Sequence, residues 1–516
     1  MTDEPTIQQL ADSVGFHLPD NFNSARLLWD NLAQNADRPA VIHDSGTWTY
    51  SELVNEAAKI GNSLKAYCSP GDRVLLLMDD EPAYPAAIMG CMRAGLVPVL
   101  LNTLSTPDLI GYFLQDSGAT AAIISDDYKD LLNEQVIKGS ACQYVLNAEQ
   151  RPWANELIEL PEHPTNRRDQ AFWMYSSGST GRPKGIVHLH EDAPYTAQTY
   201  STSILKLGVD DVCFSIPKIF FAYGFGNSVT FPMQCGAAAV LLSGRPTPER
   251  IFEQISKHRP TVLFGLPTLY TALMHHQEAE SADLRSVRLC ISAAEILSEE
   301  LASKWRSIFG LNIVEGLGST EMLHIYLTNE ETRQKPGSAG RVVLGYAVRL
   351  VDLDGREVGQ GEEGVMHVRG LSATETYWNS PEKTAETMRD GWIVTGDCFV
   401  RDEDDFYFFK GRADDLVKVS GQWVYPMEIE TTLNEHPKVR ESCVLAVELE
   451  DKRLSINAWV CLIEGVDGDE EVTQELQNFV KSRLLPHKYP RNIVYLESLP
   501  KTGTDKIDRQ ALRLLS

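Results

Sequence analysis

Short apolar runs alternate with helical patterns along most of the chain, and this alternation constrains the fold more than any other feature. The run DRVLLLM (72–78) is followed by PAYPAAIMGCMRAG, which has helical character, and then by LVPVLL. The runs TAAIIS, AAAVLL, TVLFGLP and SVRLCIS repeat this rhythm further along the chain. Short continuous apolar runs separated by helices are typical of buried, largely parallel strands. The sequence therefore predicts an α/β protein with layered sheets.

The character of the sequence changes near residue 345. From there, short β-rich segments are punctuated by Gly and Asp, as in VRLVDLDGREVGQGEEGVMHVRG. After KGRADDLVKVSG, the segment YPMEIETTLNEHP predicts a helix, and strand and helix patterns follow to the end. We expect a large N-terminal domain over residues 1–412, with a β-type subdomain at about 345–412, and a small mobile α+β C-terminal domain over 413–516.

Charge and cysteine content exclude several classes of protein. The 516 residues carry a formal net charge of −25 at pH 7, which argues against broad affinity for nucleic acid or anionic membranes. The nine cysteines include no CxxC pair, so neither a disulfide framework nor a structural zinc site is expected. The acidic N-terminus lacks a signal-peptide pattern, and Arg93 and Pro98 interrupt the most apolar region. We expect a cytoplasmic protein with no membrane span and no nucleic-acid partner, in which any phosphate site is a local positive pocket.

The stretch YSSGSTGRPKG (175–185) is the first candidate for such a pocket. It places three glycines, four Ser or Thr hydroxyls and two cations in eleven residues. It is not a Walker loop, because Pro183 precedes Lys184 and Gly185 follows it. The apolar AFWMY before it predicts a strand, so the loop is expected to be a strand-end turn whose N–H groups and hydroxyls bind an anion. A flexible surface turn is the alternative.

Further motifs occur in a fixed order after this loop. They are EGLGSTEMLHIY (315–326), VTGD ending at Asp397, GRADDLVKVSG with Arg412, and LPKTGTDKIDR near the C-terminus. Each motif alone is a weak signal, because glycine-rich turns with a charge are common. Together, their order and spacing resemble the adenylate-forming superfamily of acyl-CoA synthetases, peptide-synthetase adenylation domains and luciferases, over nearly the whole chain.

The resemblance implies a site for ATP and Mg²⁺. The loop from Ser176 to Gly185 matches the family's phosphate loop, with Thr180 near the β- and γ-phosphates and Lys184 as a mobile cation. Glu321 matches the acid that holds Mg²⁺, a hard cation that prefers carboxylate oxygens. The positions implied for nucleotide and cofactor binding are Ser176, Ser177, Gly178, Ser179, Thr180, Gly181, Lys184, Ala293, Ala294, Glu295, Thr320, Asp397, Arg412, Lys418 and Gly421.

Two of these regions match family contacts to the nucleoside. Asp397 matches the residue that accepts both ribose hydroxyls, and Arg412 would donate to the same sugar. The segment SAAEI (292–296) matches the place where adenine packs against backbone. Ala294 stands where related ligases often carry Gly, so it adds a methyl group near the expected adenine edge.

The implied reaction begins with attack of a substrate carboxylate on the α-phosphate of ATP, which gives an acyl-adenylate and pyrophosphate. This step needs no protein nucleophile, in agreement with the absence of a GxSxG elbow. Lys506 matches the lysine that offsets charge at the α-phosphate. The catalytic positions implied are Lys506, Glu321, Thr180 and Lys184.

In the family, a second half-reaction transfers the acyl group to a thiol after the small domain rotates. Asp414 matches the hinge of this rotation. Gly421 matches the glycine beside which the pantetheine of coenzyme A passes, where a side chain would obstruct the tunnel. Coenzyme A is therefore the expected co-substrate, and Asp505, beside Lys506, is a departure from the small residue that is usual there.

The residues that match the family's acyl pocket narrow the class of acid that the enzyme is expected to activate. The segments PKIFFAYGFGN, GSTEMLHIYLTN and KVSGQWVYPMEIE resemble benzoate-CoA ligases more than fatty-acid or acetyl-CoA ligases. A flat, mostly apolar slot with one imidazole suits an aromatic ring. The positions implied to line it are Ala222, Tyr223, Gly318, His324 and Ile325. We expect an ATP-, Mg²⁺- and coenzyme A-dependent aryl-CoA ligase that acts on an aromatic carboxylic acid.

Three alternatives stay open at this point. The enzyme could load an aryl group onto a carrier-protein thiol, or it could activate alicyclic or medium-chain acids. A nucleotide-binding regulatory protein without turnover is the third, although the presence of both Glu321 and Lys506 speaks against it. The sequence leaves the oligomeric state open, a homodimer included.

Overall fold

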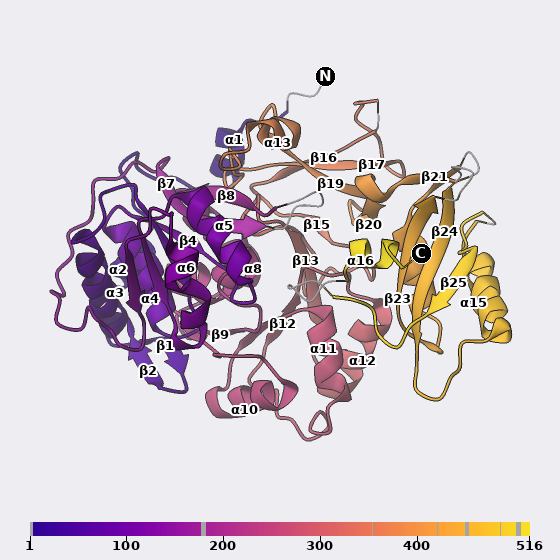
Figure 1. The fold of residues 1–516 in the computed structure, drawn as a ribbon, viewed down its shortest axis with the longest axis horizontal. Helices are drawn as coiled ribbons and strands as arrows, with labels where there is room; N and C mark the ends of the chain where they lie inside the picture. The colour runs from indigo at the N-terminus through magenta and orange to yellow at the C-terminus, as the bar shows by residue number, and fades with distance from the viewer. Residues whose placement is uncertain are drawn as a thin grey trace. The chain divides into compact units, whose positions relative to one another are not determined.

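The computed structural model describes residues 4–176, 182–352, 354–419, 422–448, 454–485, 487–501 and 507–515. Contacts divide the chain into two compact units (Figure 1). The first unit comprises Met1–Val348 and His367–Val394, and the second comprises Arg349–Met366 and Thr395–Ser516. The chain passes between them within the strands β16 (Ala347–Val351), β17 (Glu363–Arg369) and β19 (Trp392–Arg401). The expected domains, 1–412 with a β-type subdomain at about 345–412 and a mobile C-terminal domain over 413–516, stay predictions.

The first unit contains a six-stranded sheet. The inner strand pairs are parallel, and only the pair β7–β8 is antiparallel. In spatial order its strands are β6 (Tyr144–Asn147), β5 (Ala121–Ile124), β3 (Arg73–Leu77), β4 (Val97–Leu100), β7 (Gln170–Ser176) and β8 (Lys184–Leu189). The apolar runs at 72–78, 96–101 and 120–125 are thus confirmed as buried strands.

A nine-stranded sheet forms the second layer of this unit. Its spatial order is β15 (Arg341–Val342), β14 (Ile325–Thr328), β13 (Ile313–Gly318), β12 (Leu289–Ser292), β11 (Val262–Gly265), β9 (Val212–Ser215), β10 (Ala238–Val240), β1 (Pro39–His43) and β2 (Gly46–Thr49). The strands from β13 to β1 pair in parallel, and antiparallel strands flank them on both sides. The predicted α/β class with largely parallel sheets is therefore confirmed.

Helices α3 and α4 belong to the main core of this unit. A capping box starts α3, because the Thr49 hydroxyl accepts from the Glu52 N–H and the Glu52 carboxylate accepts from the Thr49 N–H. The two helices approach closely, since a Cβ added at Gly90 would lie 2.3 Å from the Ala57 carbonyl oxygen. The described α-helices of the first unit are α1 (Ile7–Ser13), α2 (Arg26–Trp29), α3 (Tyr50–Lys65), α4 (Ala83–Arg93), α5 (Pro107–Ser117), α6 (Glu134–Ile137), α7 (Asp192–Thr196), α8 (Ala222–Phe225), α9 (Phe231–Cys235), α10 (Pro248–His258), α11 (Pro267–His275), α12 (Glu299–Phe309) and α13 (Pro381–Thr387).

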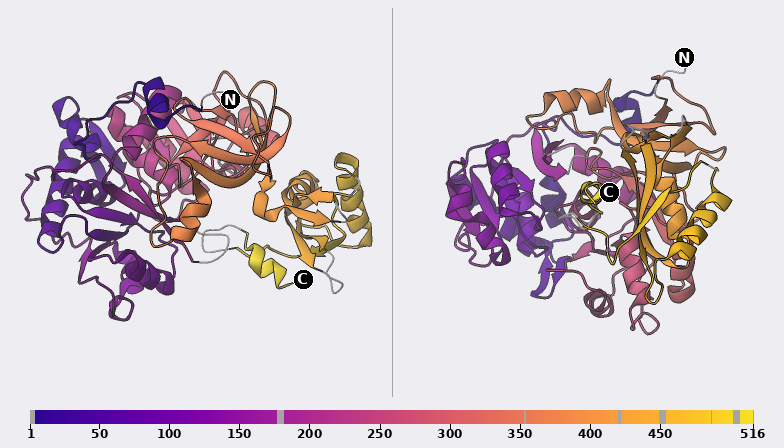
Figure 2. Two further views of the ribbon diagram at one scale, coloured as in Figure 1. Left: turned by 90° about the horizontal axis from the view of Figure 1, so that it is seen from above. Right: turned by 45° about the vertical axis from the view of Figure 1, so that its right-hand side comes forward.

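The second unit contains strand β20 (Tyr407–Arg412) and parts of β16, β17 and β19, which belong to a five-stranded sheet, and a three-stranded sheet with helices packed against it (Figures 1 and 2). Val472, Leu476 and Val480 of α15 share one apolar cluster with Ile429 of α14 and Ile456 of the sheet. The helix predicted within residues 425–437 is confirmed as α14. The sheet and helices are β23 (Val439–Glu448), β24 (Leu454–Leu462), β25 (Asn492–Tyr495), α14 (Pro426–Asn434), α15 (Glu470–Arg483) and α16 (Arg509–Arg513).

Two expectations about cysteines and membranes can be compared with the structure. All nine cysteines are free, in agreement with the prediction that no disulfide framework exists. Among the described residues, no helix combines the length and the apolar character that a membrane crossing requires.

Candidate active site

The flanks of the predicted phosphate loop are the antiparallel strands β7 and β8. Ser176 ends β7 and is paired in register with Lys184, which begins β8. The strand predicted before the loop is thus confirmed. The Tyr112 hydroxyl of α5 donates a 2.9 Å hydrogen bond to the Pro183 carbonyl, and the Arg182 guanidinium lies 5.2 Å from the centroid of the Tyr112 ring. The loop residues Ser177, Gly178, Ser179, Thr180 and Gly181 lie outside the described residues, so their roles stay predictions.

Tyr377 connects Lys184 to Glu321. The Lys184 ammonium lies 4.1 Å from the centroid of the Tyr377 ring, and the Tyr377 hydroxyl donates a 2.7 Å hydrogen bond to Oε1 of Glu321. A cation over a tyrosine face and a carboxylate at its hydroxyl are both electrostatically favourable. No sequence motif pointed to Tyr377, which is buried and lies 56 positions from Glu321.

Glu321 lies on a turn that follows β13, and the main chain of the turn is held on both sides. The Glu321 carbonyl accepts a 2.7 Å hydrogen bond from the Thr374 N–H. The Thr320 carbonyl accepts a 2.9 Å hydrogen bond from Nε2 of His188. The Met322 N–H donates to the Ser319 hydroxyl at 3.3 Å. The predicted positions Thr320 and Glu321 therefore occupy a turn whose main chain is hydrogen-bonded on both sides, but sequence reasoning missed His188.

The predicted adenine segment follows β12 directly. Ala293 is buried, whereas Ala294 and Glu295 are exposed. The Glu295 carboxylate accepts hydrogen bonds from the N–H and the hydroxyl of Thr268, at the start of α11. Ala294 has a φ of 70°, in the left-handed region that favours glycine. This conformation gives a physical reason why glycine would suit this position, as the resemblance implied.

The predicted aryl-binding residues come from α8, the end of β13 and the start of β14. Gly318 and Ile325 are register partners, and a Cβ added at Gly318 would lie 2.5 Å from the His324 carbonyl oxygen. Ala222 begins α8, and the ring centroids of its neighbour Tyr223 and of His324 lie 5.6 Å apart. The structure therefore brings the tyrosine and the imidazole into contact. Tyr200 and Phe231, which no motif singled out, also contact the imidazole, with ring centroids 5.4 Å and 4.4 Å away.

His324 is held neutral in this slot. Burial lowers its pKa to about 3. Its Nε2 lies 3.3 Å from Oδ1 of Asn227, whose Nδ2 donates to the Ser215 hydroxyl at 3.3 Å. This arrangement assigns the ring proton to Nε2, so Nδ1 is an acceptor. Nδ1 is buried and has no hydrogen-bond partner among the described residues.

The predicted ribose-binding residues lie on a hairpin of the second unit. Asp397 of β19 and Arg412 of β20 (Tyr407–Arg412) are register partners, and Nη1 of Arg412 donates to Oδ1 of Asp397 at 2.9 Å. The same nitrogen donates to the Thr395 carbonyl at 3.0 Å, and Nη2 lies 3.5 Å from Oδ2 of Asp414. The guanidinium therefore connects the predicted sugar carboxylate to the predicted hinge residue.

Three other predicted positions of the C-terminal region carry no side-chain description. Lys418 lies on β21 (Val417–Val419), and only its backbone is described. Gly421 and Lys506 lie outside the described residues. Their assigned roles stay predictions.

Two families match the chain. The AMP-binding enzyme family matches residues 28–378, and the AMP-binding enzyme C-terminal domain matches residues 428–506. The chain is 38% identical over 511 residues to a benzoate-CoA ligase of Thauera aromatica, a match that covers 96% of both proteins. It is 38% identical over 486 residues to a 4-hydroxybenzoate-CoA/benzoate-CoA ligase of Rhodopseudomonas palustris, covering 92% of this chain and 90% of the relative.

Solved structures with similar folds include two aryl-CoA ligases. An anthranilate CoA ligase in complex with anthranoyl-AMP superposes with a TM-score of 0.91 at 33% identity, covering 96% of this chain and 98% of the other. A benzoate CoA ligase from Burkholderia xenovorans superposes with a TM-score of 0.88 at 38% identity, covering 95% of this chain and all of the other. The family matches span most of the chain and agree with the motifs, and the protein therefore belongs to the AMP-binding enzyme family, within the adenylate-forming superfamily and most similar to benzoate-CoA ligases.

Proposed function

We propose that this protein is an AMP-forming aryl-CoA ligase of the benzoate-CoA ligase type. A carboxylate oxygen of the aromatic acid attacks the α-phosphorus of ATP, the bond to the β-phosphate breaks, and pyrophosphate leaves. The sulfur of coenzyme A then attacks the acyl carbon, AMP leaves, and the thiol proton passes to solvent. The observation that carries this proposal is the 38% identity to a benzoate-CoA ligase over 96% of both chains.

Glu321 is the proposed ligand of Mg²⁺. The described residues contain no group of three or more His, Cys, Asp or Glu side chains that could hold a metal ion by themselves. A single carboxylate nevertheless fits Mg²⁺, which commonly binds through one or two carboxylates together with substrate phosphates and water. The Tyr377 hydroxyl orients Oε1 of Glu321 for this role. When bound, the ion would neutralise triphosphate charge as pyrophosphate leaves.

Lys184 and the loop before it are proposed to bind the β- and γ-phosphates. The strand pair β7–β8 holds both ends of the loop at fixed positions, which supports this role. Lys506 is proposed to offset the negative charge at the α-phosphate in the first step, and Gly421 to leave space for pantetheine in the second. Asp414 is the proposed hinge between the two arrangements.

The Asp397–Arg412 pair is proposed to bind the ribose. Arg412 already orients one carboxylate oxygen of Asp397, and a carboxylate has enough lone pairs to accept sugar hydroxyls as well. The backbone of Ala293 and Ala294 is proposed to contact adenine.

The slot around His324 is proposed to bind the aryl ring of the substrate. Because His324 is neutral, the slot presents no positive charge from this side chain, which suits an uncharged ring. A ring that reaches His324 would meet an acceptor at Nδ1, and a hydroxyl or amino substituent could donate to it. We therefore expect hydroxybenzoates or aminobenzoates among the accepted acids, besides benzoate.

Product analysis tests the proposed function. The protein is incubated with ATP, Mg²⁺ and one acid at a time, with and without coenzyme A, and AMP, ADP, pyrophosphate and aroyl-CoA are quantified. The panel contains benzoate, hydroxybenzoates, anthranilate, cyclohexanecarboxylate and hexanoate. AMP together with aroyl-CoA supports the proposal. AMP and pyrophosphate without thioester would point to a carrier-protein acceptor, and a preference for the non-aromatic acids would overturn the aryl assignment.

A further inference from the structure

Two fully buried ionisable side chains meet beside the Glu321 turn, and no motif singled them out. His188 lies near the end of β8, and Asp192 begins α7. Their side chains are 0% and 1% exposed, and Nδ1 of His188 lies 2.8 Å from Oδ2 of Asp192. The same carboxylate oxygen accepts a 3.0 Å hydrogen bond from the Leu189 N–H. Phe172 of β7 stacks on the imidazole with centroids 5.2 Å apart, so the ring has one defined orientation.

The other nitrogen of His188 reaches the site. Its Nε2 lies 2.9 Å from the carbonyl oxygen of Thr320, which precedes Glu321. Both ring nitrogens therefore face oxygen acceptors, whereas a neutral imidazole has only one N–H. A second proton must lie between Nδ1 and Asp192, either on the ring or on the carboxyl group. In both forms Nε2–H donates to Thr320.

Strand β8 also contacts the Glu321 turn at further points. Lys184 and His188 are four residues apart on one strand, so their side chains project from the same face. Lys184 lies over Tyr377, whose hydroxyl contacts the Glu321 carboxylate. Thr374, whose N–H binds the Glu321 carbonyl, donates its hydroxyl to the Val187 carbonyl at 2.7 Å. Strand β8 thus positions Glu321 in two ways. Lys184 acts on the Glu321 carboxylate through Tyr377, and Val187 acts on the Glu321 backbone carbonyl through Thr374.

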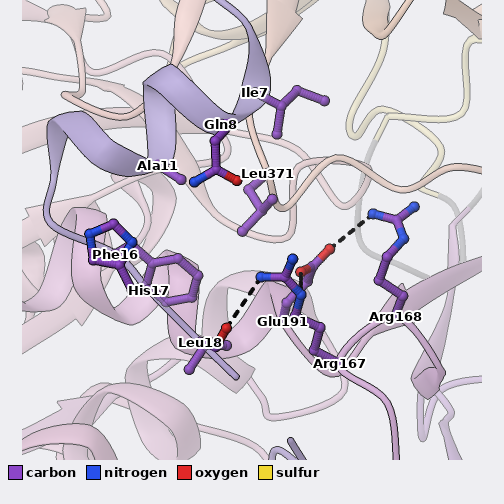
Figure 3. A pocket seen from close by; sticks show the side chains of 10 residues that line it. All are labelled: Ile7, Gln8, Ala11, Phe16, His17, Leu18, Arg167, Arg168, Glu191 and Leu371. Atoms are coloured by element: carbon purple, nitrogen blue, oxygen red, sulfur yellow. Dashed lines mark hydrogen bonds and ion pairs between the residues drawn. The ribbon is translucent and has the colours of Figure 1, made fainter. Parts of the chain in front are cut away.

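The corner between β8 and α7 is anchored from outside by Glu191 (Figure 3). Its carboxylate lies between Arg168, at 3.1 Å, and Arg167, at 3.5 Å, in the wall of a cavity of about 390 Å³. Each arginine has a second acidic partner, Asp20 for Arg167 and Glu375 for Arg168. The cavity therefore offers no surplus positive charge for an anionic ligand, and the ion pairs act as a structural anchor.

We propose that His188 and Asp192 are a positioning pair for the adenylate-forming step. Asp192 keeps the imidazole in the form that donates from Nε2 to the Thr320 carbonyl, and this bond keeps the Glu321 carboxylate where Mg²⁺ and ATP meet. The inference rests on the proposed function, because the role of Glu321 is part of it. It requires that the pair affects Mg²⁺-dependent ATP binding and adenylate formation, and not thioester formation from an aroyl-adenylate, which contains no triphosphate.

The main test is Asp192→Asn. The amide oxygen would replace Oδ2 as the acceptor for the Leu189 N–H, and it would then take its second hydrogen bond from Nδ1–H. The neutral ring would present a lone pair at Nε2 to the Thr320 carbonyl, and the bond would be lost. Loss of a side chain that orients a metal ligand typically lowers metal affinity or activity by about 10- to 100-fold. We expect a loss of this size in ATP affinity with Mg²⁺, measured by calorimetry, and no loss in ATP affinity with EDTA.

Three companion variants separate positioning from folding. His188→Gln retains an amide N–H near the position of Nε2 and is expected to recover most of the Mg²⁺ effect. His188→Phe keeps the stacking on Phe172 but has no donor, so it should resemble Asp192→Asn. Glu191→Gln, the matched control, removes a neighbouring buried carboxylate that does not contact His188. It should lower the melting temperature and leave the Mg²⁺ dependence of ATP binding unchanged.

The outcomes are distinguishable. If His188→Phe and Asp192→Asn retain the Mg²⁺ dependence of ATP binding, or if they slow both half-reactions equally, the positioning role is wrong. If Asp192→Asn does not fold, the comparison of His188→Gln with His188→Phe decides in the same way. If the wild-type protein forms no AMP with any aromatic acid, the proposed function fails, while the calorimetric comparison still decides the role of the pair.

Discussion

Two buried histidines lie near the turn that carries Glu321, His188 in contact with Thr320 and His324 three residues after Glu321, and their surroundings differ. His188 contacts a carboxylate and a carbonyl, so it shares a proton with Asp192 and donates to Thr320. His324 contacts an amide and three aromatic rings, and burial holds it neutral with a pKa of about 3. The side of the site assigned to triphosphate thus holds an imidazole that contacts oxygen atoms at both ring nitrogens, whereas the imidazole on the side assigned to the aryl ring is neutral. One residue type serves two purposes because its neighbours differ: His188 contacts the Asp192 carboxylate and the Thr320 carbonyl, whereas His324 contacts the Asn227 amide and aromatic rings.

Glu321→Gln is expected to have the largest effect, because it removes charge from the triphosphate side alone. The amide can still accept from the Tyr377 hydroxyl, so the fold of the turn is retained. Loss of one preorganised electrostatic group typically costs about 10²- to 10³-fold in rate. Pyrophosphate release should fall by this factor, and thioester formation from supplied benzoyl-adenylate should persist. An equal loss in both steps would contradict the division between the two sides.

Asn227→Asp would make the surroundings of His324 resemble those of His188. An opposite charge within hydrogen-bonding distance favours the protonated ring and typically raises a histidine pKa by about 1–3 units. A pH titration of the imidazole signals by NMR should show this rise, and benzoate activation should decline at acidic pH. An unchanged titration would show that burial alone, and not the neighbouring side chain, controls the protonation of His324.

The contribution of His324 to the stability of the wild-type protein changes with pH in a defined direction. The pKa of His324 is about 3 in the folded protein, below the ordinary histidine value of 6.5, so the unfolded chain binds the proton more tightly. His324 therefore destabilises the fold as the pH falls from about 6.5 toward 3, with a slope of at most about 1.4 kcal/mol per pH unit. In denaturant titrations, His324→Leu should lose less stability than the wild-type protein over this window. Equal slopes would contradict the buried neutral ring.

Tyr377→Phe tests how strongly the triphosphate side depends on its aromatic bridge. The ring under Lys184 remains, but the hydroxyl that donates to Glu321 is lost. A hydrogen bond to a charged group contributes about 1.5–3 kcal/mol, which corresponds to a loss of about 10-fold or more in adenylate formation. Tyr112→Phe is the matched control, because that hydroxyl donates to the uncharged Pro183 carbonyl. A smaller effect of Tyr377→Phe than of its control would refute the bridge.

His324→Ala should have the smallest effect, confined to the aryl side. A neutral hydrogen bond contributes about 0.5–1.5 kcal/mol, so the preference for hydroxybenzoates over benzoate should shift by about 2- to 10-fold. The apparent affinity for ATP should stay constant. A change in ATP affinity alone would place His324 outside the acyl slot.

Much of the fold was predictable because its signals are local. Continuous apolar runs such as 72–78 became the predicted buried strands, and Pro426 opens the predicted helix α14. The ordered motifs also predicted that Asp397 and Arg412 bind one sugar; the two residues are hydrogen-bonded to each other, and the sugar-binding role stays a prediction. These features depend on short segments that each carry their own pattern.

The partners of the site residues were not predictable in this way. Tyr377 lies 56 positions from Glu321, and His188 lies 132 positions from Thr320, so the contacts exist only because the chain topology brings distant segments together. A signal for the second case was nevertheless visible. The segment HLHED (188–192) places four ionisable residues directly after an apolar strand, where burial makes pairing necessary.

The proton between His188 and Asp192 is shielded from water, because both side chains are completely buried. It can exchange with solvent deuterium only when the corner between β8 and α7 opens, since buried hydrogens exchange through local opening. Its exchange lifetime therefore records how often this corner opens. Comparing that lifetime with and without ATP would show whether bound nucleotide slows the opening of the corner between β8 and α7.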